Sequence, residues 1–123
     1  MLTRLALVAA LVVGTVACGG GGGDAVDRAL DRLEDDERFD TAFEAGDTFA
    51  SIGGLLQAEG EERSSEPLLS AAAYAQVLAV RVLDCTAPGR FEAREALRTF
   101  LRDVGDTDDT DRAPQPPPAP DCR

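Results

Sequence analysis

Histidine, lysine, asparagine and tryptophan are all missing from this chain of 123 residues. Histidine is the usual general base near neutral pH and the usual nitrogen ligand of zinc, so its absence argues against both kinds of site. All twelve basic residues are arginine, and Ile52 is the only isoleucine, a bias typical of a GC-rich genome. We therefore expect a protein that is not an enzyme and that holds no cofactor and no metal.

Positive charge is also scarce. The chain has 23 acidic residues against 12 basic ones, which gives a formal net charge of −11. A surface of this kind repels nucleic acid and anionic lipid headgroups, and it favours a cationic partner. We expect no nucleic-acid partner.

The first eighteen residues have the pattern of an export signal. Arg4 supplies a positive charge, and residues 5–17 form an uncharged apolar run that is too short to span a membrane. The small residues 14–17 lie directly before Cys18, and this arrangement resembles the lipobox of bacterial lipoproteins. The resemblance implies that a signal peptidase removes residues 1–17 and that Cys18 carries a diacylglyceryl anchor. Because the removed segment holds one arginine and no acid, the net charge of the processed chain would change from −11 to −12.

The sequence then divides into a tether, a helical domain and a tail. Residues 18–23 hold the lipid-bearing cysteine and five glycines, a disordered tether that reaches only about 12 Å. Residues 24–104 carry the apolar periodicity of helices, and residues 105–123 are rich in Asp and Pro and contain no core-forming pattern. We expect one small helical domain held close to the membrane, followed by a solvated tail.

Apolar spacing predicts four helices, over 24–36, 37–58, 65–85 and 90–104, with Asp24 as the N-cap of the first. A polar loop is expected over 60–64, and Ser65 with Pro67 marks the start of the third helix. The apolar stripe expected for the last helix is Ala93, Ala96, Leu97, Phe100, Leu101 and Val104. The fold class expected is all-α, a small up-down four-helix bundle. Gly46 and the Gly53–Gly54 pair would bend or split the second helix, whose apolar stripe includes Phe43. The third helix is apolar nearly all round, which indicates a central, buried position.

Charged flanks predict how the first and last helices pack. Three acids of the first helix occupy one flank of its apolar stripe, and three arginines of the last helix occupy the corresponding flank. Antiparallel packing would bring these flanks together, with Glu34 or its neighbours beside Arg94 or Arg98. The opposite edges, Arg28 and Arg32 against the acids of the last helix, would match as well. The residues in the two first-named flanks are Asp27, Asp31 and Glu34, and Arg90, Arg94 and Arg98.

Two cysteines remain after Cys18. Exported proteins meet oxidising conditions, so we expect a disulfide between Cys85 and Cys122. Closing that loop of roughly 38 residues would contribute about 4 kcal/mol in the chain-entropy model. The alternative is two free thiols, with Cys85 packed as a small hydrophobe.

Two charged clusters suggest binding sites, each with a simpler alternative. Arginines at every fourth residue of the last helix would form a partner-binding ridge, but pairing with acids of the first helix is the favoured interpretation. The aspartates after Gly105 invite a calcium site, but Asp111 and Pro117 occupy positions where an EF-hand loop needs Gly and Glu, which favours a solvated tail. The two sets are Arg90, Arg94, Arg98 and Arg102, and Asp106, Asp108, Asp109 and Asp111.

The combined prediction is a lipid-anchored lipoprotein on the extracytoplasmic face of the cell membrane that binds a protein of the cell envelope. One alternative is an inhibitor or immunity-type lipoprotein, because dense negative charge attracts basic proteins. The other is a carboxylate-dependent hydrolase built on a pair such as Asp36 and Asp40. Two carboxylates with raised pKa in a deep cleft would favour the hydrolase, and an acidic convex face would favour binding.

Overall fold

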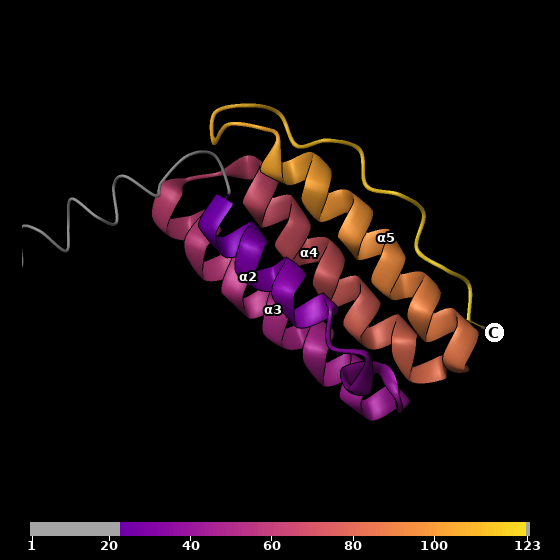
Figure 1. The fold of residues 1–123 in the computed structure, drawn as a ribbon. Helices are drawn as coiled ribbons and strands as arrows, with labels where there is room; N and C mark the ends of the chain where they lie inside the picture. The colour runs from indigo at the N-terminus through magenta and orange to yellow at the C-terminus, as the bar shows by residue number, and fades with distance from the viewer. Residues whose placement is uncertain (1–22, 123) are drawn as a thin grey trace, which may run out of the picture.

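The computed structural model describes residues 23–122, and within this range the protein is a bundle of four α-helices without strands. This confirms the all-α bundle (Figure 1). The predicted signal over 1–17, the lipidated Cys18 and all of the glycine tether except Gly23 lie outside the described residues. The helices are α2 (Gly23–Leu33), α3 (Ala42–Arg63), α4 (Glu66–Arg81) and α5 (Ala87–Gly105), with short 3-10 turns η1 (Asp36–Phe39) and η2 (Val82–Asp84).

Side-chain caps fix where the two central helices begin. The hydroxyl of Thr41 accepts a hydrogen bond from the amide of Glu44, and the hydroxyl of Ser65 accepts one from the amide of Leu68. Ser64 adopts the left-handed conformation, φ 53° and ψ 44°, between the end of α3 and the start of α4. The first helix differs from the prediction, since α2 begins at Gly23 and Asp24 lies inside its first turn.

The second predicted helix was placed wrongly. Residues 36–39 form η1 instead, and α3 begins only at Ala42 and continues to Arg63, through the stretch 60–64 that was expected to be a polar loop. No break in α3 occurs at its glycines, because Gly46, Gly53 and Gly60 are buried against α4. Their close packing against the neighbouring helix replaces the predicted bend or split.

The third and fourth helices follow the prediction more closely. Helix α4 begins after Ser65 and passes into η2, and α5 extends three residues further towards its N-terminus than expected. Pro88 fits the first turn of α5 because the missing amide has no intrahelical partner there. The segment Glu66–Asp84 is long and apolar enough to cross a membrane, yet half of that window is buried inside the bundle.

The core is built around three phenylalanines and one tyrosine. Phe39 and Phe49 meet edge to face with ring centroids 5.5 Å apart, and Tyr74 and Phe100 meet in the same way at 5.3 Å. The predicted apolar stripe of the last helix is confirmed, since five of its six residues are buried and Ala96 packs partly buried against the core. The five buried residues are Ala93, Leu97, Phe100, Leu101 and Val104.

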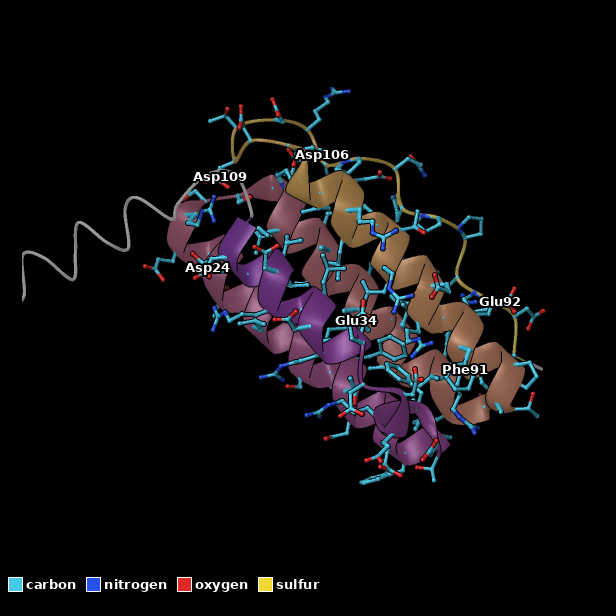
Figure 2. All side chains as sticks on the ribbon, in the orientation of Figure 1. Asp24, Glu34, Phe91, Glu92, Asp106 and Asp109 are labelled. Atoms are coloured by element: carbon cyan, nitrogen blue, oxygen red, sulfur yellow. A yellow bond between two sulfur atoms is a disulfide. The ribbon has the colours of Figure 1, made fainter. Side chains whose placement is uncertain are left out.

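Helices α2 and α5 are antiparallel, as the charged flanks predicted. Val26 near the start of α2 lies beside Gly105 at the end of α5, and the last residue of α2, Leu33, meets Arg94 and Arg98. Glu34 pairs with Arg98 at 3.7 Å. Figure 2 shows Glu34 facing α5 and Asp24 at the opposite end of α2.

The second predicted edge between these helices was wrong. Arg28 pairs with Glu59 at 4.0 Å, and Arg32 donates a hydrogen bond to the hydroxyl of Ser51, so both arginines face α3. In a closed bundle each helix has two neighbours, and the basic flank of α2 faces the second of them.

After Gly105 the chain turns and residues 106–122 run back along α5 towards Cys85 (Figure 1). Ala119 and Cys122 are partly buried and pack against the core. The tail is therefore tied to the bundle at its distal end, rather than solvated along its whole length.

Candidate functional site

The two cysteines at the base of α5 are brought together as predicted. Cys85 and Cys122 are joined as a disulfide with their Cα atoms 4.6 Å apart, within the usual range for such a bond. Gly89 makes room for the pair, since a Cβ atom at that position would lie 3.2 Å from each sulfur. The disulfide positions the end of the tail against η2 and the first turn of α5.

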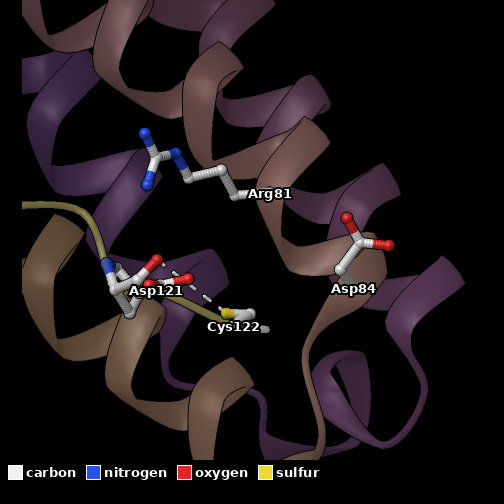
Figure 3. A pocket seen from close by; sticks show the side chains of 5 residues that line it. Arg81, Asp84, Asp121 and Cys122 are labelled. Carbon is white, nitrogen blue, oxygen red and sulfur yellow. Dashed lines mark hydrogen bonds between the residues drawn. The ribbon is translucent and has the colours of Figure 1, made fainter.

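An open, polar hollow of about 390 Å³ lies beside this disulfide (Figure 3). Arg81 and Asp84 line it from α4 and η2, and the last residues of the tail line it from the other side. Nearby, the hydroxyl of Tyr74 is buried and has no hydrogen-bond partner within residues 23–122. Burial raises the pKa of Tyr74 above its ordinary value, and Arg81 opposes that shift.

Three of the four arginines of the predicted ridge point into the bundle, and the fourth is exposed to solvent. Arg90 is the first of the three. Its guanidinium donates hydrogen bonds to the carbonyl oxygens of Phe39 and Asp40, each at 2.8 Å, and of Cys85 at 3.1 Å. It therefore ties η1 and the residue that follows it to the segment before α5.

Arg94 and Arg98 also point inwards. Both donate to the carbonyl of Leu33 at 3.4 Å, and their side chains are only 15% and 13% exposed. Arg94 pairs with Asp36, and its guanidinium carbon lies 4.8 Å from the ring centre of Phe91. Its Nε, like that of Arg98, is buried without a hydrogen-bond partner among the described residues.

Arg102 alone among the four is exposed, and it makes no ion pair within residues 23–122. The contacts therefore support intramolecular pairing for the other three arginines. The sequence predicted one of their acidic partners, Glu34 beside Arg98, but not Asp36 beside Arg94 and not the carbonyl acceptors. A signal for these acceptors exists where α2 ends at Leu33. The last carbonyl groups of a helix, and those of η1, have no donor within their own element and need one from elsewhere in the chain.

Three of the carboxylates that suggested other functions make local contacts, namely those of Asp36, Asp109 and Asp111. Asp36 pairs with Arg94, and the backbone carbonyl of Asp40 accepts from Arg90. In the tail, Arg63 holds Asp109 through two hydrogen bonds of 2.9 Å, and the carboxylate of Asp111 accepts from the amide of Asp108 at 2.7 Å. Figure 2 places Asp106 and Asp109 at the end of the bundle where α2 begins. Within the described part of the chain, no group of three or more acidic or cysteine side chains is arranged to hold a metal ion.

A different surface was not identified from the sequence. Four large apolar side chains are exposed where the outer sides of α3 and α4 meet, and we call this surface the α3–α4 face. Phe43 was predicted for the core, but it is 78% exposed. Val80 and Leu83 are 69% and 55% exposed, and Val77 is also exposed, so the third helix is not buried all round.

Helical geometry explains the exposure of Phe43. Six residues at 100° each place Phe43 about 120° around α3 from Phe49, which is fully buried. Both cannot face one core, and the choice of Phe49 leaves Phe43 outside. A wheel drawn on the correct helix, from Ala42 onwards, would have found this.

Comparisons with known proteins add no relative. No protein-family model matches the chain, and neither a curated protein nor a solved structure matches it.

Proposed function

We propose that the protein is a lipoprotein, anchored through Cys18 on the extracytoplasmic face of the cell membrane, whose helical domain binds a protein of the cell envelope. The location is supported by the apolar run over 5–17 and by the Ala17–Cys18 junction. The binding role is supported by one observation above all: four large apolar side chains are exposed on the surface of an acidic domain.

A role in binding fits the charged groups better than a role in catalysis. The chain contains no histidine, and Asp36, one of the two carboxylates considered for a hydrolase, is paired with Arg94 of α5. The side chains of Arg90, Arg94 and Arg98 are used to hold the bundle together. These contacts favour a structural framework that presents a surface.

An inhibitor or immunity-type lipoprotein is the second candidate. The charge of −12 expected for the processed chain favours it, because a dense negative surface speeds the approach of a basic protein. The two candidates differ in the partner alone, which would be a resident envelope protein or a basic toxin or enzyme.

The anchor is tested by substituting Cys18 in the full chain. Cys18→Ser should move the protein from the membrane fraction to the soluble fraction and abolish its partition into a detergent phase, since the thioether cannot form. Cys85→Ser serves as the matched control, because it breaks the disulfide with Cys122 but leaves Cys18 in place, and it should leave the protein at the membrane. Detergent-phase partition that persists in Cys18→Ser would reject the anchor.

The binding role is tested by co-purification from envelope extracts with the acylated full-length protein as bait. Wild type should retain a specific protein that Phe43→Ala loses, because the substitution removes the most exposed apolar group. Identical sets of co-purified proteins for the two baits would contradict a partner site on this surface.

A further inference from the structure

We propose that the α3–α4 face is a docking site for a cationic amphipathic helix of the partner. This proposal builds on the proposed function and adds the chemistry of the partner. Helices that bind in this way place an apolar side in a groove and interact through charges along the rim.

Close packing of α3 and α4 determines the shape of the face. Gly46, Gly53 and Gly60 recur every seven residues along α3, and Leu83, Gln76 and Leu69 recur at the same interval along α4. A Cβ atom on each glycine would lie 3.1 Å from Leu83, 2.4 Å from Gln76 and 2.9 Å from Leu69, respectively. Side chains of α4 thus lie directly on the glycines of α3, and we call this line of contacts the seam between the two helices.

Apolar groups lie on both sides of one end of this seam. Phe43 is one turn before Gly46, and Leu83 packs directly onto Gly46, so the two exposed side chains share one region. Val80 and Val77 precede Leu83 by one and two turns, and each step of three residues turns about 60° around the helix, so Val77 lies further from α3 than Val80 does. Phe43, Leu83 and Val80 therefore form the apolar centre of the face.

The charges beside these groups are acidic. Asp47 is one turn after Phe43, and Asp84 is one turn after Val80; both are exposed and make no ion pair within residues 23–122. Helix α3 holds five acids before its single arginine, Arg63, which is occupied by Glu59 and Asp109. Arg81 is the one base of α4, and it lines the hollow by the disulfide together with Asp84, so Asp47 and Asp84 outnumber it beside these apolar groups. An apolar stripe with an acidic rim is complementary to a helix with an apolar stripe and basic flanks.

The same charges disfavour two other occupants. A second copy would bring Asp47 and Asp84 towards their own counterparts, and an anionic bilayer would meet a surface of like charge. Both would be weakened by repulsion, whereas a cationic helix would be attracted. We therefore assign the face to a basic protein segment and use the other two occupants as opposing outcomes of the test.

The experiment uses the chain from Gly19 to Arg123, because all core residues lie between Ala25 and Val104 and the tail ends at Arg123. The probe is a synthetic helical peptide of leucine and lysine, with the leucines on one side. Titration should give saturable one-to-one binding that weakens with added salt. A peptide of the same composition in scrambled order, and one with glutamate in place of lysine, should not bind.

Two substitutions locate the site. Phe43→Ala should weaken binding of the amphipathic peptide at least about tenfold, as expected for an aromatic anchor, and because Phe43 is exposed the fold should persist. Asp47→Asn should weaken it less and reduce the salt dependence. Asp31→Asn is the matched control, since it removes the same charge from α2 and should leave the affinity within about twofold.

Several outcomes would overturn the assignment. Equal binding by wild type and Phe43→Ala, or equal binding of the scrambled peptide, would mean that charge alone acts. Self-association lost in Phe43→Ala would assign the face to a second copy, and binding to vesicles of phosphatidylcholine and phosphatidylglycerol lost in the same variant would assign it to the membrane. Because the chain in this test has no anchor, failure here would leave membrane attachment and envelope co-purification to be judged by their own experiments.

Discussion

The two sides of the bundle are held together in different ways. Helices α3 and α4 meet over three glycines, and no ion pair joins these two helices in the part of the chain that the structure describes. The side where α5 meets α2 and η1 is held by Arg90, Arg94 and Arg98, which reach backbone carbonyls and carboxylates. One side depends on close contact of small and large residues, and the other depends on long side chains that satisfy the ends of helices.

This difference determines which surface is available to a partner. On the arginine side the guanidinium groups are used internally, and their exposed fractions are small. On the glycine side the helices are so close that Phe43, Val80 and their neighbours have no place between them. Leu83 lies over Gly46 at the surface because the two helices are close, and Phe43 is exposed beside it because Phe49 occupies the core.

The largest effect should come from the disulfide, which extends the arginine side because the carbonyl of Cys85 accepts from Arg90. Cys122→Ser should lower the free energy of unfolding by about 4 kcal/mol, the chain-entropy value for a loop of this length. Denaturant unfolding measures the loss. Alkylation of the unreduced wild type followed by intact-mass analysis should modify neither thiol, and two added alkyl groups would show that the bond is absent.

Removing an inward arginine should have the next largest effect. Arg94→Ala should lower the free energy of unfolding by about 2 kcal/mol, because it removes contacts with Asp36, the Leu33 carbonyl and the ring of Phe91. Arg102→Ala, an exposed position on the same helix, should change it by less than about 0.5 kcal/mol. Similar losses in the two variants would show that the inward contacts add nothing.

The glycine side is tested by a pair of alanine substitutions in α3. Gly60→Ala should destabilise the protein by about 1 kcal/mol, since the new methyl group would lie 3.1 Å from the backbone nitrogen of Leu69. Gly54→Ala meets nothing within 4 Å and should stabilise it by up to about 1 kcal/mol through helix propensity. Thermal unfolding measures both changes. If the two substitutions changed the stability in the same direction, the close packing of α3 against α4 would be contradicted.

The smallest effect concerns Tyr74, at the boundary between α4 and α5. Its buried hydroxyl has no partner in the described residues, so Tyr74→Phe should change the free energy of unfolding by less than about 1 kcal/mol, towards greater stability. Burial raises the pKa of Tyr74 above 10.0 in the folded protein. The free energy of unfolding is therefore unaffected by this group below pH 10, and it falls as the pH rises through the folded pKa. Above pH 10, the free energy of unfolding of Tyr74→Phe should therefore decrease less with rising pH than that of wild type.

Local patterns were enough to predict the helices that begin with clear caps, and the orientation of the first and last helices. Ser65 with Pro67 marked the start of α4, and the stripe around Leu97 and Phe100 marked the buried side of α5. These features depend on neighbours in sequence, which any reader of the chain can compare.

Features that depend on close packing against a second helix were missed. Gly46 was interpreted as a helix breaker, because its role requires Leu83 from α4. Phe43 was assigned to the core because the predicted start of the helix was five residues too early, which hid its angle from Phe49. The carbonyl partners of Arg90 became visible only once η1 replaced a helical turn.

The central claim is that the arginine side is closed and the glycine side is open to a partner. Amide chemical shifts of ¹⁵N-labelled protein, recorded during titration with the leucine–lysine peptide, test it most directly. The account predicts that the changes concentrate on α3 and α4 around Phe43 and Val80, and that amides of α2 and of residues 90–98 stay in place. Changes centred on α2 and residues 90–98 would contradict it.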